Sequence, residues 1–164
     1  MANLAPFPDL PPPQGNADVT IPLNVTCTGK FGWVLNGKLW VLPLDNFTPL
    51  LFQPSQFALL NKYTYFLYKN GLVVDLIFTV TAGNPAMHPP HPMHKHGVKA
   101  WLLGLGDSVF LYASIKAAVD AGYKGINMKN PPYRDDFVTQ ENCLETPSQF
   151  YLVPYPLRKL QPAK

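Results

Sequence analysis

Charged side chains are scarce in this 164-residue chain: Asp, Glu, Lys and Arg make up 14% of it, against a typical value of about 25%. The 13 basic and 10 acidic residues leave a formal net charge of +3, with no basic cluster longer than Arg158-Lys159. A protein without a basic patch is not expected to bind nucleic acid. No uncharged apolar stretch reaches the roughly 18 residues of a membrane helix, so the sequence also predicts no membrane span.

Cysteine and targeting signals are equally scarce. Cys27 and Cys143 are the two cysteines of the chain, and in a reducing compartment we expect two separate thiols rather than a disulfide. The N-terminal residues 1–13 have no basic region, and prolines interrupt any apolar core of a signal peptide, which predicts a cytoplasmic protein. Glycosylation sequons at Asn24 and Asn46 are typical of secreted proteins. A secreted protein whose leader has been removed is therefore the alternative.

Proline, in contrast, is abundant, with 19 residues that divide the chain into short runs typical of strands. Residues 1–17 are expected to form a Pro-rich arm and 18–164 a single domain. Runs rich in β-branched and aromatic residues predict strands at Val19–Thr26, Phe31–Leu35, Lys38–Leu42, Thr64–Tyr68, Leu72–Thr81, Val98–Leu105 and Val109–Tyr112, with edge strands at Val138 and Phe150–Val153. The predicted class is an all-β antiparallel sandwich or Greek-key barrel.

Local signals add turns, one helix and a core. Asn36-Gly37 is the strongest hairpin signal, and Asn70-Gly71 after Lys69 is a second. Alanines followed by Gly122 predict a short helix at Ser114–Ala121. The expected core is aromatic and consists of Phe31, Trp33, Trp40, Phe66, Phe78, Trp101 and Phe110.

All four histidines lie within nine residues: His88, His91, His94 and His96. In a strand, residues two apart share a face, so His94 and His96 are expected side by side with Lys95 turned away. Two imidazoles on one face are half of a copper or zinc site. The same side chains are equally compatible with hydrogen bonds to backbone groups, or with a metal-free pocket in which they act as acids, bases or donors.

The histidine block carries a family resemblance. The run His91-Pro-Met-His-Lys-His-Gly resembles the His-Pro-x-His-Leu-His-Gly block of laccases and other multicopper oxidases. The resemblance covers roughly residues 18–140. It extends to Phe31-Gly-Trp-Val-Leu-Asn-Gly-Lys-Leu-Trp, to Ala100-Trp-Leu-Leu-Gly-Leu-Gly-Asp-Ser-Val-Phe and to Asn130-Pro-Pro-Tyr-Arg-Asp-Asp-Phe-Val. It implies a C-terminal cupredoxin domain, that is, a cupredoxin-like Greek-key fold.

The resemblance also implies ligands. His91 corresponds to a ligand of the mononuclear blue copper, and His94 and His96 correspond to ligands of the trinuclear cluster. Two features depart from the family pattern: Lys95 replaces the usual Leu, and the later His-Cys-His block has no counterpart, because no histidine flanks Cys143. A blue copper centre needs two histidines and a cysteine thiolate. Four-electron reduction of dioxygen by this chain is therefore not expected.

A compact polar group follows Pro132. Tyr133 and Arg134 are candidates to hold an oxyanion or phenolate, and Asp135 or Asp136 is a candidate to orient a histidine. The structural alternative is a solvated turn with an ion pair.

Three functions remain open. The favoured one is a non-oxidative enzyme on a truncated laccase-like scaffold, without cofactor, that cyclises or isomerises a phenolic, polyketide or terpenoid intermediate of fungal-type secondary metabolism by pericyclic or dehydrative ring closure. Its catalytic residues would be His94, His96, Tyr133, Arg134 and Asp135. The second is a copper-binding oxidoreductase domain with an incomplete site. The third is a non-catalytic partner of another cupredoxin protein, and a homo-oligomer is also considered.

Overall fold

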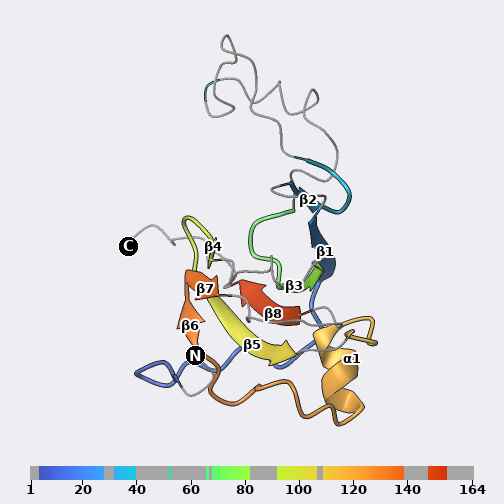
Figure 1. The fold of residues 1–164 in the computed structure, drawn as a ribbon. Coiled ribbons are helices and arrows are strands. Elements are labelled where there is room, and N and C mark those ends of the chain that lie inside the picture. Colours follow the sequence, from blue (N-terminus) through green and yellow to red (C-terminus); the bar gives the residue numbers. More distant parts are fainter. Residues whose placement is uncertain are drawn as a thin grey trace.

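The computed structural model describes residues 4–27, 32–39, 52, 66, 68–81, 92–106 and 109–138, together with the backbone of 148–154 (Figure 1). These residues form strands and one short helix. The elements are β1 (Val19–Cys27), β2 (Trp33–Leu35), β3 (Val74–Thr81), β4 (Pro92–His94), β5 (Ala100–Gly106), α1 (Ile115–Asp120), β6 (Tyr133–Arg134), β7 (Asp136–Val138) and β8 (Ser148–Pro154).

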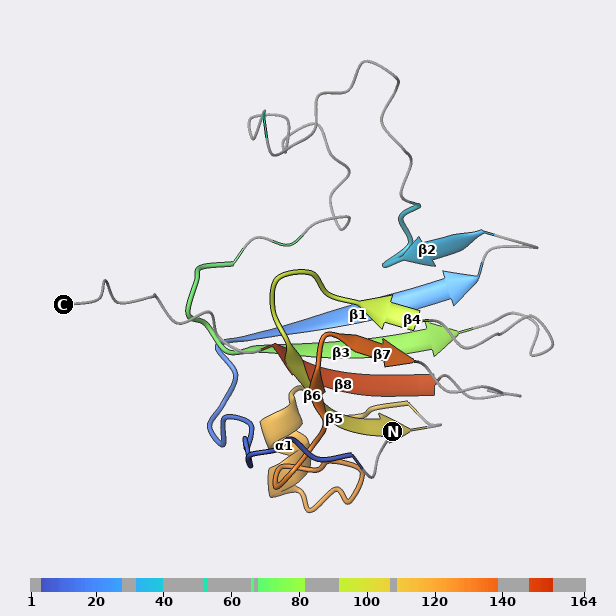
Figure 2. The same cartoon turned by 90° about the vertical axis from the view of Figure 1, so that its left-hand side faces the viewer.

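The strands form two sheets. The large sheet has six strands in the order β2-β1-β3-β8-β5-β6, and the small sheet pairs β4 with β7. Neighbours run antiparallel except β1 and β3, which are parallel over Val19 to Thr26. Figure 2 shows the small sheet lying in front of the large one. The molecule is therefore an all-β, cupredoxin-like fold with one short helix, as the sequence predicts.

One face of the large sheet packs against the small sheet. Phe137 of β7 is 2% exposed and meets the buried side chains of three strands of the large sheet. Met93 of β4, opposite Phe137 in the small sheet, packs against the same cluster. The cluster consists of Ile21, Leu23, Val74, Phe78, Val80, Ala100, Leu102 and Phe137.

The other face of the large sheet is covered by α1 and by the N-terminal residues. Trp101 and Leu103 turn to this face, where they pack with Ile77 and with Ile115 of the helix. Leu10 joins the same cluster, and its carbonyl accepts a 2.8 Å hydrogen bond from the indole Nε1 of Trp101. Adjacent residues of β5 thus serve opposite cores, as the alternation of side chains along a strand requires.

The helix begins where the sequence predicts. The Ser114 hydroxyl accepts a 3.1 Å hydrogen bond from the Ala117 N–H, and the chain turns at Gly122 with φ of 74°. A second acceptor comes from the large sheet, because the buried Asp75 of β3 accepts 3.1 Å from the Ile115 N–H. The two acceptors satisfy N–H groups that the first helical turn leaves without a partner inside the helix.

The Asn36-Gly37 hairpin is confirmed. Asn36 and Gly37 have φ of 49° and 74°, the positive values that a type I′ turn requires, and Leu35 exchanges two backbone hydrogen bonds with Lys38. The second signal gives a turn with Gly71 at φ of 89°, but Tyr68 is not in a strand. Residues 40–42 of one predicted strand lie outside the described residues, as do 64, 65 and 67 of another, in which Phe66 is not in a strand.

Two strand predictions are wrong. Val109–Tyr112 is not a strand: Phe110 packs into the helix-covered core, while Val109 and Leu111 are exposed. Its alternating pattern instead reflects the partly buried Phe110 ring in the segment that leads to the N-cap of α1. The segment Phe150–Val153 is not an edge, because β8 lies between β3 and β5.

The aromatic core is confirmed in part. Phe78 and Trp101 are buried, and Trp33 and Phe110 are partly buried against the two cores. Phe66, at 38% exposed, is wrongly assigned to the core. Phe31 and Trp40 lie outside the described residues. Within the described part of the chain, no helix is long and apolar enough to cross a membrane.

The packing of Phe137 yields a stability prediction. Phe137→Ala removes the largest side chain that the small sheet buries, so we expect the free energy of unfolding to fall by about 3–5 kcal/mol. Urea unfolding measures this change. Leu111→Ala, at a position 86% exposed, is the control and should change the value by less than about 0.5 kcal/mol. Equal losses in both variants would contradict the two-layer packing.

Burial raises the pKa of Asp75 above its ordinary value of 3.8, because desolvation outweighs the hydrogen bond from Ile115. The folded state therefore holds the proton more tightly than the unfolded chain. This contribution to stability is complete below about pH 3.8 and is lost as the pH rises through the raised pKa. Asp75→Asn keeps an acceptor for Ile115 and should remove this loss. Urea unfolding across a pH series, with exposed Asp9→Asn as control, tests it; identical pH profiles for Asp75→Asn and the unsubstituted chain would refute it.

Candidate functional site

The candidate site is built around the bend where the chain passes from the large sheet to the small one. β6 ends at Arg134, and β7 begins at Asp136, with Asp135 between them. β6 pairs with β5 through Ala100 and Arg134, whereas β7 pairs with β4 through His94 and Asp136. The bend therefore connects the strand opposite the histidines directly to the edge of the large sheet (Figures 1 and 2).

The two described histidines lie side by side at the end of β4. Their ring centroids are 4.6 Å apart at an interplanar angle of 78°, an edge-to-face contact. β4 ends at His94. His96 therefore lies beyond the strand, in a turn in which Gly97 has φ of 80°. Both histidines are exposed. The two rings are neighbours, as the sequence predicts. A turn after His94, rather than a continuing strand, brings them together.

Lys95 occupies a different environment from the histidines on either side. It is half-buried, and its backbone N–H donates a 2.9 Å hydrogen bond to the carbonyl of Asp135. Burial lowers the pKa of the Lys95 ammonium, because desolvation disfavours its charged form. The hydrogen bond extends the pairing of β4 and β7 by one residue and fixes the start of the turn that carries His96.

Arg134 and Tyr133 project to opposite sides of β6. The Arg134 guanidinium donates from Nε and Nη2 to the two carboxylate oxygens of Asp136, each at 3.2 Å. The Tyr133 ring instead packs 4.9 Å from the Trp101 ring in the helix-covered core, with Lys99 Nζ 5.9 Å from its centroid. The structure therefore brings Arg134 to the histidine side and places Tyr133 with the other core.

The acidic residue opposite His94 is Asp136. The sequence predicts Asp135 or Asp136 to orient a histidine, with Asp135 as the candidate catalytic residue. In the structure, Asp135 accepts the hydrogen bond from Lys95 through its backbone carbonyl. Spacing could have distinguished them: Phe137 must point inward, so its neighbour Asp136 points outward with Arg134, two residues before it.

A metal would find two described ligands at this site. His94 and His96 offer imidazole nitrogens on neighbouring rings, a donor pair that suits copper or zinc. Within the described ranges, no group of three His, Cys, Asp or Glu side chains is arranged to hold a metal. His91, the third predicted ligand, lies outside these ranges together with His88 and Cys143, so the three-histidine set stays a prediction.

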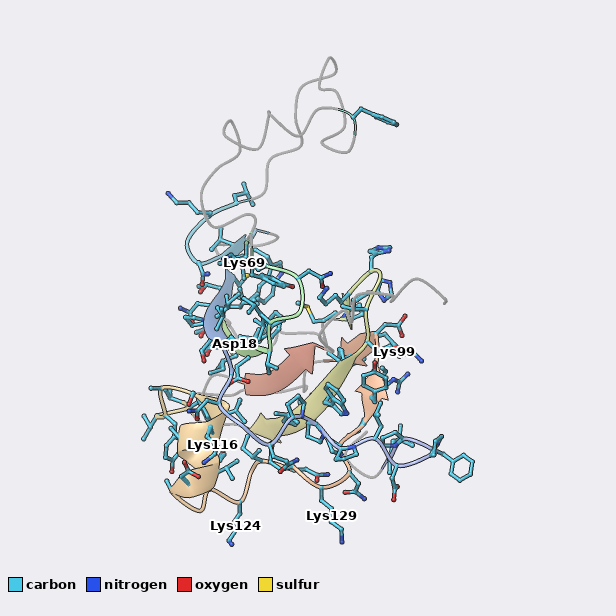
Figure 3. All side chains as sticks on the ribbon, turned by 180° about the vertical axis from the view of Figure 1, so that it is seen from behind. Asp18, Lys69, Lys99, Lys116, Lys124 and Lys129 are labelled. Carbon is cyan, nitrogen blue, oxygen red and sulfur yellow. The ribbon has the colours of Figure 1, made fainter. Side chains whose placement is uncertain are left out.

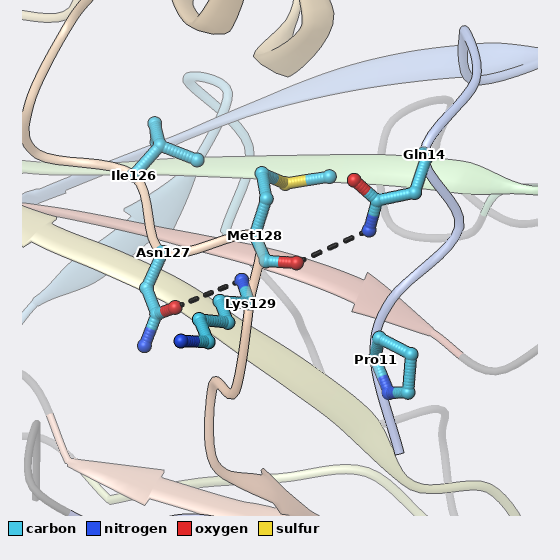
Figure 4. A pocket seen from close by; sticks show the side chains of 6 residues that line it. All are labelled: Pro11, Gln14, Ile126, Asn127, Met128 and Lys129. Carbon is cyan, nitrogen blue, oxygen red and sulfur yellow. Dashed lines mark hydrogen bonds between the residues drawn. The ribbon is translucent and has the colours of Figure 1, made fainter. Parts of the chain in front are cut away.

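A shallow depression that is open to solvent lies elsewhere, between the N-terminal arm and the segment after α1 (Figure 4). Gln14 Nε2 bridges its walls by donating 3.1 Å to the Met128 carbonyl. None of the predicted site residues lines it; the lining residues are Pro11, Gln14, Ile126, Asn127, Met128 and Lys129.

The described lysines lie on several elements of the molecule. Figure 3 shows Lys99 beside β5 and β6, while Lys116 lies on α1 and Lys124 and Lys129 follow it in the chain. Lys116 is paired with Asp120. The basic side chains nearest the histidine pair in sequence are therefore Lys95 and Lys99.

Comparison with known proteins identifies the family. The family model described as "Multicopper oxidase" matches residues 45–142, which include β4, β5 and the bend. The chain belongs to the multicopper oxidase family.

Fungal relatives of this multicopper oxidase domain agree with that assignment. Laccase 1 of Metarhizium anisopliae is 34% identical over 141 residues, covering 84% of this chain and 23% of the relative. Laccase-1 of Emericella nidulans is 32% identical over 121 residues, with coverages of 71% and 20%. A multicopper oxidase of Talaromyces pinophilus is 33% identical over 139 residues, with coverages of 82% and 23%. The chain thus spans about a fifth to a quarter of the length of these curated relatives.

The exposure of the histidines leads to a prediction about stability. His94→Ala and His96→Ala should each change the free energy of unfolding by less than about 0.5 kcal/mol, because neither ring fills a core. Urea unfolding of the metal-free chain measures this. A loss above about 1 kcal/mol in either variant would show that the ring serves the fold.

Proposed function

We propose that this domain supplies His94 and His96 as copper ligands in a laccase-like oxidoreductase. The observation that carries the proposal is the contact between two exposed imidazoles at the end of β4, in a chain of the multicopper oxidase family. Copper, when bound, would supply one-electron chemistry to the domain. A phenolic compound is the substrate class we propose, in line with the laccase names of the relatives.

The residues around the histidines favour metal binding over other uses. The imidazoles are accessible to a metal ion and to donors from outside the described residues, because both are exposed. Two histidines do not complete a copper site, so the remaining ligands come from His91 or from another domain or chain. This is the incomplete site that the sequence predicts.

The metal-free ring-closing enzyme is the competing proposal. Such an enzyme orders its substrate in an apolar cavity that contains the acid or base. The open depression lined by Pro11, Gln14 and Met128 contains neither histidine. Tyr133, a candidate to hold an oxyanion or phenolate, packs against Trp101. The packing of Tyr133 in the helix-covered core is the observation that supports the copper proposal over the ring-closing one.

Copper binding to the intact chain tests the proposal. We expect calorimetric titration with Cu²⁺ to give about one copper per chain, and His94→Ala and His96→Ala each to weaken binding at least roughly tenfold. The spectrum should lack the intense band of a copper–thiolate bond, because no cysteine flanks the histidines.

Lys99→Ala is the matched control, since it removes an exposed side chain near the site that is not a ligand. Binding that is absent, or equal in all three variants, would overturn the copper proposal. The ring-closing proposal would then be tested by turnover of phenolic and terpenoid candidates by the same His variants.

A further inference from the structure

We propose that Asp136, held in place by Arg134, is a positioning residue for His94. The inference rests on the proposed copper function and assigns a role to two residues that are not themselves ligands. Its observation is that one carboxylate faces His94 across the small sheet and is fixed by a guanidinium from the large sheet.

His94 and Asp136 are directly opposite each other in the antiparallel pairing of β4 and β7. Residues paired in this way point to the same side of a sheet, with Cβ atoms about 4.5–5.5 Å apart. The inward side of this sheet is taken by Met93 and Phe137, so His94 and Asp136 both face outward and both are exposed. Asp136 is thus the acidic residue that the pairing places opposite His94.

The carboxylate is held in a fixed place. Arg134 Nε and Nη2 each donate 3.2 Å to one of its oxygens, the two-point geometry that fixes both position and orientation. Arg134 is itself anchored, because its backbone pairs with Ala100 of β5. Phe137, the next residue after Asp136, is buried in the core. The position of the carboxylate is therefore set by both sheets at once.

This arrangement suits orientation rather than ligation. Both Asp136 oxygens already accept from Arg134, so the carboxylate is engaged with a cation before a metal arrives. A ring nitrogen of a ligating histidine commonly donates to a carboxylate, which fixes the ring and raises its basicity. Negative charge opposite His94 also offsets the positive charge of Lys95 next to it.

The first experiment compares two neighbouring acidic residues. Asp136→Asn and Asp135→Asn make the same charge change one residue apart in the intact chain. We expect Asp136→Asn to weaken Cu²⁺ binding by about 10–100-fold and to change the paramagnetic resonance spectrum of the bound Cu²⁺. Asp135→Asn should leave both close to those of the unsubstituted chain, because Asp135 contacts β4 through its backbone carbonyl.

A second variant separates positioning from simple stabilisation of the small sheet. The double variant Arg134→Asp/Asp136→Arg keeps an ion pair at the bend but moves the carboxylate away from the position opposite His94. Hydrogen exchange of the Lys95 N–H, which bonds to Asp135, reports the integrity of the small sheet without metal. We expect exchange protection close to that of the unsubstituted chain, with Cu²⁺ binding still weakened.

The outcomes are distinct. Equal Cu²⁺ affinity in Asp136→Asn and Asp135→Asn would overturn the positioning role and leave the copper proposal intact. Full affinity in the double variant would show that the ion pair, rather than the placement of the carboxylate, matters, and would also overturn it. Absence of Cu²⁺ binding in the unsubstituted chain would overturn the copper proposal and this inference with it.

Discussion

Burial of Phe137 between the two sheets determines where the histidines lie. β7 is three residues long, so one inward side chain fixes its orientation, and the antiparallel pairing then assigns the orientation of β4. With Phe137 and Met93 turned to the core, His94 and Asp136 must face outward. The site is thus a consequence of hydrophobic packing: an apolar contact on one side of the small sheet presents polar side chains on the other.

Local signals could be predicted from the sequence, because they depend on a few adjacent residues. The positive φ that Asn36-Gly37 adopts, the Ser114 cap and the Gly122 stop each follow from the conformational preferences of the residues involved. The long strands β1 and β3 are also evident, because each is a run of β-branched and apolar residues. The contact between His94 and His96 could also be predicted, because two residues so close in sequence have little conformational freedom to move apart.

Pairing and packing between segments far apart in the sequence could not be predicted in the same way. β8 lies inside the large sheet because it pairs with both β3 and β5, and nothing within Ser148–Pro154 specifies those partners. The pattern of Val109–Tyr112 suits a strand, but no single-sequence signal tells that Phe110 would fill a core beside α1. The sequence leaves Asp135 and Asp136 open for the same reason: what distinguishes Asp136 is its pairing with His94, some forty residues earlier in the chain.

The proposed copper site, completed from outside the described residues, would make a specific demand on this domain. A half-site contributes to binding only if its ligands are already placed when the other ligands arrive, because freezing mobile rings would consume the free energy gained on coordination. Exposed histidines at a strand end lack the packing that normally fixes a side chain. Here the backbone hydrogen bond from Lys95 to Asp135 and the ion pair of Arg134 with Asp136 act on either side of the bend. Together they connect the small sheet to the large one beside the two histidines, so the proposed ligands lie at a bend that is bonded to both sheets.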